Sequence, residues 1–177
     1  MSIAVIYGGT RENGNTEILT EHAIKGFQVE RIYLKDFNIL PIEDLRHDQE
    51  GFKEVHDNYN SIIKRLLTHD TIIFSTPIYW FGMTGQMKNF IDRWSQTFRD
   101  SKFPNFKNQM SSKSAFLIAV GGDNPQIKGL PLIQQFQYIF DFAGISFEGY
   151  VLGEGNKPGE ILNDKKALHF ANKLLND

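Results

Sequence analysis

The 177-residue sequence contains no cysteine. Such a chain forms no disulfide, and it offers no thiolate for a nucleophile, a zinc ribbon or an iron–sulfur cluster. The absence of cysteine also fits a reducing compartment. Basic residues are not in excess, because 19 lysines and arginines face 21 aspartates and glutamates, a net charge of −2. A chain with this balance has little charge to neutralise a phosphate backbone, so we expect no nucleic-acid partner.

Long apolar runs are also missing. No stretch approaches the ~18 continuous apolar residues of a membrane-spanning helix. The first apolar run ends at Tyr7 and is followed at once by Gly8 and Gly9, so it does not extend into a secretory leader. We therefore expect a cytoplasmic protein that begins with a strand and does not insert into a membrane.

The common signatures of metal and hydrolase sites are absent. The sequence has neither an H-E-x-x-H motif nor a G-x-S-x-G motif, and no two histidines are spaced i, i+4. We predict no metal ligands and no hydrolytic triad. We interpret each histidine as a surface or capping residue: His22, His47, His56, His69 and His169.

Apolar runs typical of buried strands alternate with helical patterns along the whole chain. The predicted strands are residues 3–7, 27–34, 71–75, 115–120 and 145–152, and the predicted helices are 16–25, 55–67, 87–98, 132–143 and 167–175. Residues 35–53 and 101–112 are polar and predicted as loops. We find no internal repeat and no linker, so residues 1–177 form one domain. This alternation indicates right-handed crossovers and a parallel sheet covered on both faces. One of two common strand orders for such a sheet is the flavodoxin-like 2-1-3-4-5.

Ligands of open parallel sheets bind beyond the carboxyl ends of the strands, so the loops there matter most. Residues 8–16 contain three glycines, two threonines, Arg11 and Asn15 just before a predicted helix. Backbone N–H groups at a helix start favour a phosphate, although a glycine turn capped by Asn15 or Thr16 has the same composition. An NTP-binding P-loop would have lysine where Asn15 stands, which argues against a triphosphatase.

Two further loops point to a flat ligand. Tyr79, Trp80 and Phe81 are three aromatic residues in one connection, which predicts stacking on a ring; the alternative is packing in the core or in a subunit interface. Gly121 and Gly122 follow the fourth strand, where bare backbone amides can meet the polar edge of a ring, although the segment is also an ordinary turn.

The motifs in these loops resemble those of one protein family. Residues 8–16 read G-G-T-R-E-N-G-N-T, similar to a G-S-P-R-x-x-G-N-T phosphate loop, and residues 77–93 read P-I-Y-W-F-G-M-T-G-Q-M-K-N-F-I-D-R. Both resemble the NAD(P)H-dependent FMN reductase and NAD(P)H:quinone oxidoreductase family of the flavodoxin-like superfamily. The resemblance implies an α/β, flavodoxin-like three-layer sandwich with a five-stranded parallel sheet in the order 2-1-3-4-5. The family's iron–sulfur members carry a cysteine cluster after the second strand, and residues 41–47 contain none here.

The resemblance also implies a function. An FMN-dependent oxidoreductase passes hydride from NAD(P)H to N5 of its flavin and on to a small acceptor such as a quinone, flavin, nitro or azo compound, so we assign no catalytic side chain. The alternative is a flavodoxin-type electron carrier, which the small net charge of −2 supports poorly. The resemblance implies a homodimer or homotetramer built around helix three, where Lys88, Asp92 and Arg93 have structural or interface roles. Residues 101–112 are either a lid over the site or a solvated connector. The candidate cofactor-binding residues are Gly9, Thr10, Arg11, Gly14, Asn15, Thr16, Pro77, Ile78, Tyr79, Trp80, Phe81, Gly121, Gly122 and Asp123.

Overall fold

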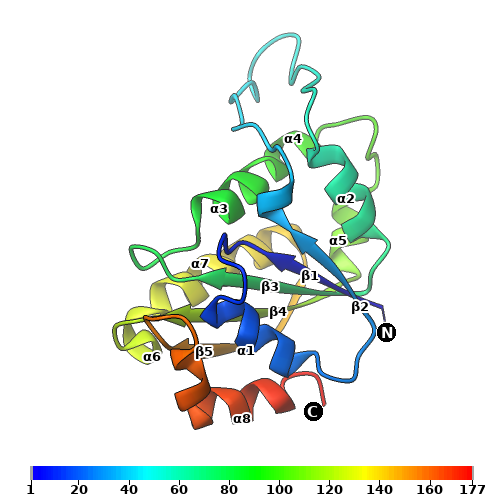
Figure 1. Cartoon of the computed structure of the whole chain (residues 1–177). Helices are drawn as coiled ribbons and strands as arrows, with labels where there is room; N and C mark the ends of the chain where they lie inside the picture. Colours follow the sequence, from blue (N-terminus) through cyan, green and yellow to red (C-terminus); the bar gives the residue numbers. More distant parts are fainter. Residues whose placement is uncertain (1, 177) are drawn as a thin grey trace.

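The computed structural model describes residues 2–176, and its centre is a five-stranded parallel sheet (Figure 1). The strands lie in the order β2-β1-β3-β4-β5, which confirms the predicted flavodoxin-like topology. β2 lies on one side of β1, and β3, β4 and β5 follow in order on the other side. The strand bounds are β1 Ile3–Tyr7, β2 Val29–Tyr33, β3 Thr71–Pro77, β4 Ser114–Gly121 and β5 Ser146–Glu154.

Helices cover both faces of the sheet (Figure 1). α1 (Asn15–Ala23) and α8 (Lys165–Lys173) cover one face, where Val5 and Ile73 of the central strands are buried. The larger core lies on the other face, where Ile6 and Phe74 are buried. Neighbouring residues of a strand belong to different cores, because successive side chains of a strand point to opposite faces. The other helical elements are η1 Leu34–Asp36, α2 Tyr59–Leu67, α3 Gly85–Asp92, α4 Trp94–Thr97, α5 Phe106–Ser111, α6 Pro125–Lys128, α7 Leu130–Ala143 and η2 Glu160–Asn163.

A buried ion pair joins the end of α3 to the long connection between η1 and α2. The Arg93 guanidinium donates to Asp57 Oδ2 at 2.7 Å, to the carbonyl of Leu40 at 2.9 Å and to Gln96 Oε1 at 2.8 Å. It also lies over the ring of Tyr59 at 4.5 Å. Arg93 and Asp57 each have side chains only 1% exposed, so this ion pair lies in the interior. Arg93 therefore has the structural role that the sequence motif left open.

Two helices near this ion pair differ from the sequence prediction. Predicted helix 87–98 is divided into α3 and α4 at Arg93, whose side chain turns into the interior. Predicted helix 55–67 begins only at Tyr59. Asp57 lies just before this helix, where its carboxylate accepts hydrogen bonds from the backbone N–H groups of Leu40 and Tyr59 as well as from Arg93.

The segment 101–112 is neither a lid nor a solvated connector, and the prediction of a loop was wrong. It contains α5, whose Phe106 and Met110 are buried in the larger core. Phe106 packs edge-to-face against Trp94 and Phe98. α5 leads directly into β4, so it lies at the amino ends of the strands, opposite the loops that follow β1, β3 and β4. In residues 2–176, no helix has both the length and the apolar character needed to cross a membrane.

Candidate functional site

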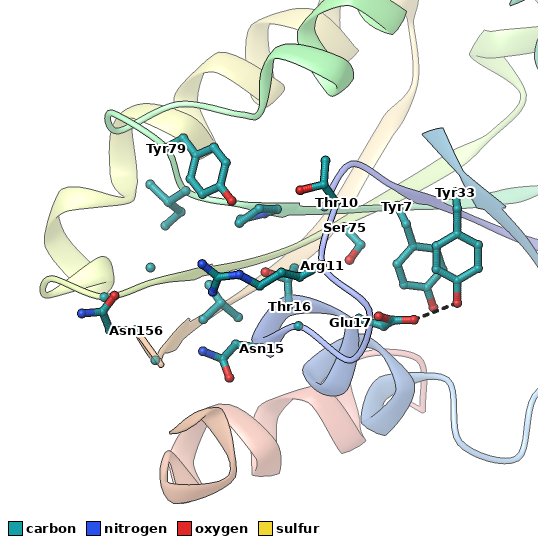
Figure 2. A pocket seen from close by; sticks show the side chains of 18 residues that line it. Tyr7, Thr10, Arg11, Asn15, Thr16, Glu17, Tyr33, Ser75, Tyr79 and Asn156 are labelled. Carbon is teal, nitrogen blue, oxygen red and sulfur yellow. Dashed lines mark hydrogen bonds between the residues drawn. The ribbon is translucent and has the colours of Figure 1, made fainter. Parts of the chain in front are cut away.

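A cavity of about 260 Å³ lies at the carboxyl ends of the strands (Figure 2). Its walls come from the loops after β1, β3 and β4, as the sequence predicted, and also from the chain after β5. The volume is near the lower end of the ~300–1,000 Å³ that ligand pockets span, so a ligand of cofactor size would lie partly outside it. The site adjoins the point where the strand order reverses, the usual ligand position in open α/β sheets.

The structure brings most of the predicted site residues together. Trp80, Phe81 and Asp123 are the exceptions and do not line the cavity. The Asp123 carboxylate instead forms an ion pair with Lys128. The predicted residues that do line the cavity are Gly9, Thr10, Arg11, Gly14, Asn15, Thr16, Pro77, Ile78, Tyr79, Gly121 and Gly122.

The loop after β1 presents unpaired donors to the cavity. Within residues 2–176, the backbone N–H groups of residues 9–12 and 14–16 have no hydrogen-bond acceptor. Gly14 is the N-cap of α1, so several of these groups carry the positive end of the helix dipole. Figure 2 shows the Arg11 side chain extending between Tyr79 and Asn156, and Arg11 has no ion-pair partner among the described residues. Unpaired N–H groups and a free guanidinium beside one cavity make a site for an anion.

Contacts with neighbouring elements fix the shape of this loop. Gly8 donates to the Ser75 carbonyl at 2.8 Å, and its own carbonyl accepts from Thr84 Oγ1 at 2.8 Å. A Cβ on Gly8 would meet Thr84 Oγ1 and the Met87 side chain at 3.0 Å, so the close approach to α3 requires glycine. The loop after β1 is therefore held against the start of α3.

A pair of stacked tyrosines borders the cavity, and sequence reasoning missed both. The rings of Tyr7 and Tyr33 lie 4.5 Å apart at 12°. Tyr7 donates to Glu21 at 2.6 Å. Tyr33 donates to Glu17 at 3.0 Å, as the dashed line in Figure 2 shows. Burial, reinforced by these carboxylates, raises the pKa of Tyr7, and the same causes raise the pKa of Tyr33 to about 12. Both phenols therefore stay neutral at pH values below about 12 and act as hydrogen-bond donors.

Glu17 links the tyrosine pair to the loop after β1, residues 8–14. One of its oxygens accepts from Tyr33, and the other accepts from the backbone N–H of Asn13 at 2.8 Å. Asn13 has φ of +52°, a left-handed conformation that asparagine adopts more readily than most residues. An acidic residue in the first turn of α1 was visible in the sequence, but its partner on β2 could be found only from the fold.

The three consecutive aromatic residues form a strained turn. Tyr79 and Gly82 exchange two backbone hydrogen bonds of 3.0 Å, and the residues between them, Trp80 and Phe81, have φ of +48° and +65°. Such a two-residue turn normally contains asparagine or glycine, because bulky residues at positive φ cost about 1–2 kcal/mol each. Tyr79 reaches the cavity, whereas Trp80 is 96% exposed.

Asn156 is a further cavity residue that the sequence did not indicate. It follows β5, in a connection for which no ligand role was predicted, yet its side chain packs on Gly122. A Cβ on Gly122 would lie 2.9 Å from Asn156 Cβ. One reason for a glycine at position 122 is therefore that a side chain there would collide with Asn156. No pattern in the sequence pairs these two residues.

Asn15 lies at the cavity, but its side chain also has partners in the protein. Its amide donates to the Lys157 carbonyl at 2.9 Å, and its oxygen accepts from the Ile161 N–H at 3.4 Å. These bonds join the start of α1 to the segment after β5. The backbone N–H of Asn15 remains available at the helix terminus, while the side chain closes the wall of the cavity.

Comparisons with known proteins agree with this geometry. The sequence model of the family described as NADPH-dependent FMN reductase matches residues 1–141. The Bacillus subtilis protein YwqN is 65% identical over 175 residues, which cover 99% of this chain and 97% of that protein. Its name describes an NAD(P)H-dependent FMN-containing oxidoreductase.

Two further relatives extend the comparison. The solved structure of the Trp repressor binding protein from Bacillus subtilis has a TM-score of 0.84 at 57% identity, covering 98% of this chain and 97% of that chain. The iron–sulfur flavoprotein MJ1083 of Methanocaldococcus jannaschii is 27% identical over 188 residues, covering 98% of this chain and 93% of that protein. This chain, which has no cysteine, lacks the ligands for a cysteine-bound cluster.

The predicted motifs, the strand order, the anion-binding loop and the family match all lead to one assignment. The chain belongs to the NADPH-dependent FMN reductase family and is an NAD(P)H-dependent flavin oxidoreductase with FMN as its cofactor.

Proposed function

We propose that the cavity holds FMN, with the phosphate at residues 9–16 and the ring between the loops after β3 and β4. The row of unpaired backbone N–H groups at the start of α1, joined by Arg11, carries this assignment. A phosphate accepts several such bonds at once, which is the chemistry that this donor set fits. Pro77 and Tyr79 line the side where the ring would lie, and Gly121 and Gly122 line its end.

Bound FMN supplies the hydride chemistry, accepting from NAD(P)H and donating to a second substrate. The chain binds and orients the reactants. Its neutral Tyr7 and Tyr33 donate to Glu21 and Glu17, so neither phenol is free to act as an acid or base. Tyr79 is 51% exposed at the mouth of the cavity and offers an aromatic face to an incoming ring. These features favour a flat small-molecule acceptor such as a quinone, flavin, nitro or azo compound.

An absorption spectrum tests this proposal most directly. Purified protein is mixed with FMN, separated from unbound flavin and then treated anaerobically with NADPH. We expect retained visible flavin bands that bleach without any protein partner, followed by recovery of the bands when a quinone is added. Retained flavin that NADPH fails to bleach would instead indicate the electron carrier. A titration in which the protein shows no affinity for FMN would overturn the cavity assignment.

We also propose that the protein works in the cytoplasm as a homodimer or homotetramer. Its interface would be the exposed apolar side chains of the strained turn and of α7. Gly82 of the strained turn approaches Gln135 of α7, so the turn and the helix share one surface. α7 has Asp141 as its only charged residue and exposes Leu130, Tyr138 and Phe142. A nearly uncharged patch can meet its own copy across a two-fold axis without repulsion.

Replacing the turn residues separates association from folding. We expect the double variant Trp80→Asn/Phe81→Gly to stabilise the protomer by about 1–2 kcal/mol in total, because asparagine and glycine adopt positive φ easily, whereas the larger backbone entropy that glycine loses on folding offsets part of the relief at the two positions. The same variant should weaken self-association by at least tenfold, because it removes two exposed aromatic side chains. Sedimentation velocity measures the association, and denaturant unfolding measures the protomer. A parent protein that sediments as a monomer at all concentrations would contradict the interface.

A further inference from the structure

The wall of the cavity formed after β5 contains a polar side chain whose hydrogen-bonding groups are free. Gly155 donates to the Gly121 carbonyl at 3.0 Å and thereby extends the β4–β5 pairing beyond the end of the sheet. This bond places Asn156 next to Gly122, where its Cβ and Cγ would lie 2.9 and 3.1 Å from a Cβ on that glycine. Figure 2 shows Asn156 at the end of the cavity opposite Tyr7 and Tyr33.

The backbone of Asn156 is fixed from both sides. Glu160 Oε2 accepts hydrogen bonds from the N–H groups of Asn156 at 2.9 Å and Lys157 at 2.8 Å. These two bonds hold the pKa of Glu160 below its usual range, so the carboxylate stays ionised. On the other side, Asn15 binds the Lys157 carbonyl and the Ile161 N–H. The segment is therefore attached to the start of α1, which is the phosphate end of the same cavity.

The carboxamide of Asn156 has no partner within the protein. In the described part of the chain, neither the oxygen nor the nitrogen of this carboxamide takes part in a hydrogen bond, although the backbone N–H of Asn156 is bonded to Glu160. The N–H groups of Gly122 and Asp123 beside it also have no acceptor there. This end of the cavity thus offers adjacent donors together with a side-chain acceptor, the Asn156 oxygen.

A flavin ring has a matching pattern at one edge. The pyrimidine part carries two carbonyl acceptors on either side of an N–H donor. A carboxamide presents a donor and an acceptor side by side, so it can bind the N–H and a neighbouring carbonyl together. Backbone N–H groups alone can bind the carbonyls but cannot accept from the ring N–H. Among the glycines that line this end of the cavity, Asn156 is the residue whose side chain supplies an acceptor together with a donor.

We propose that Asn156 is a cofactor-specificity residue that recognises the N3–H and an adjacent carbonyl of the flavin ring. The proposal rests on FMN binding in this cavity, and it adds a fourth element to the three loops that the sequence predicted. It also gives a reason for the bonds from Glu160 and Asn15: they hold the backbone around Asn156 in place before the cofactor arrives. Gly122 then serves to admit this side chain as well as the ring.

The test compares the binding of two flavins by the parent protein and by variants at Asn156 and Asn163. The full chain, the variant Asn156→Ala and the control variant Asn163→Ala are titrated with FMN and with 3-methyl-FMN, which lacks the N3–H donor. Asn163 is an exposed asparagine of η2 that does not line the cavity. Dissociation constants come from the quenching of flavin fluorescence. Thermal unfolding without flavin shows whether each variant is folded.

We expect the parent protein and Asn163→Ala to bind FMN at least tenfold more tightly than 3-methyl-FMN. In Asn156→Ala, affinity for FMN should fall about tenfold, and the preference over 3-methyl-FMN should shrink to less than threefold. A general structural defect would weaken both flavins equally, and that result would overturn the proposal. An unchanged preference in Asn156→Ala would overturn it as well.

Failure of the proposed function gives a different result. In that case the parent protein binds neither flavin, and both the cavity assignment and the role of Asn156 fall together. If the parent binds FMN tightly but does not discriminate against 3-methyl-FMN, the cavity assignment stands and the role of Asn156 alone is wrong. A third variant, Asn156→Gln, carries the same amide on a longer side chain. We expect it to recover part of the preference, because the donor and acceptor pair is kept.

Discussion

Replacing Arg93 with methionine should lower the stability of the protein by about 3–5 kcal/mol, the usual cost of leaving a buried charge without its partner. The Asp57 side chain would remain 1% exposed with no cation beside it, and the Leu40 carbonyl would lose its donor. For a domain of this size the melting temperature falls about 2–4 °C per kcal/mol, so a fall of about 6–20 °C is expected. Scanning calorimetry or denaturant unfolding measures the change.

The matched control for Arg93 lies on the same helix. Lys88 forms an ion pair with Asp92, but both side chains are well exposed, at 49% and 39%. Lys88→Met should therefore change stability by less than about 1 kcal/mol. Adding Asp57→Asn to Arg93→Met should recover part of the loss, because asparagine removes the uncompensated charge and its one amide oxygen still accepts from either the Leu40 or the Tyr59 N–H group. Equal effects of Arg93→Met and Lys88→Met would refute the structural role of the buried pair.

Replacing Arg11 with alanine should weaken FMN binding by about 10–100-fold. A hydrogen bond between charged groups contributes about 1.5–3 kcal/mol, and each 1.4 kcal/mol is a factor of ten. Riboflavin, which has the same ring without the phosphate, should bind the variant and the parent protein equally. Titration of both flavins by fluorescence quenching measures the difference. Added salt should weaken FMN binding in the parent protein more than in the variant, because the screened charge is absent from the variant.

The control for Arg11 is another exposed arginine. Arg99 donates to the Ser95 carbonyl and does not line the cavity, so Arg99→Ala should leave both flavins unaffected. A loss of riboflavin affinity in Arg11→Ala as large as the loss of FMN affinity would show that Arg11 acts on the ring or on the loop. The phosphate would then depend on the backbone N–H groups and the helix terminus alone.

The motifs were sufficient to predict most of the cavity. Residues 9–16, Pro77 to Tyr79, Gly121 and Gly122 lie together because each follows a parallel strand, and parallel strands end at the same edge of the sheet. The same reasoning placed Trp80 beside them, but the turn at positive φ carries it away into solvent. A run of three aromatic residues does not reveal the sign of φ at each position.

Long-range contacts account for what sequence reasoning missed. The polar composition of residues 101–112 predicted a loop, although Phe106 and Met110 alone bury enough apolar surface to anchor a short helix. Arg93 was recognised as part of a motif, but its burial depends on Asp57, which a local pattern cannot pair with it. Tyr33 and Glu17 likewise meet only because β2 lies beside β1 and under α1.

The sequence by itself determined the layered fold and the place of the glycine-rich loop after the first strand. The layers follow from local periodicity and from the fixed handedness of strand–helix–strand crossovers. The strand order was implied by the resemblance of the motifs to those of a flavodoxin-like family. Only the tertiary structure decided that Asn156 lines the cavity, that Trp80 lies in solvent and that Arg93 is buried. Each of these depends on side chains that meet across the fold or on the sign of a backbone dihedral. Neither is encoded in the spacing of neighbouring residues.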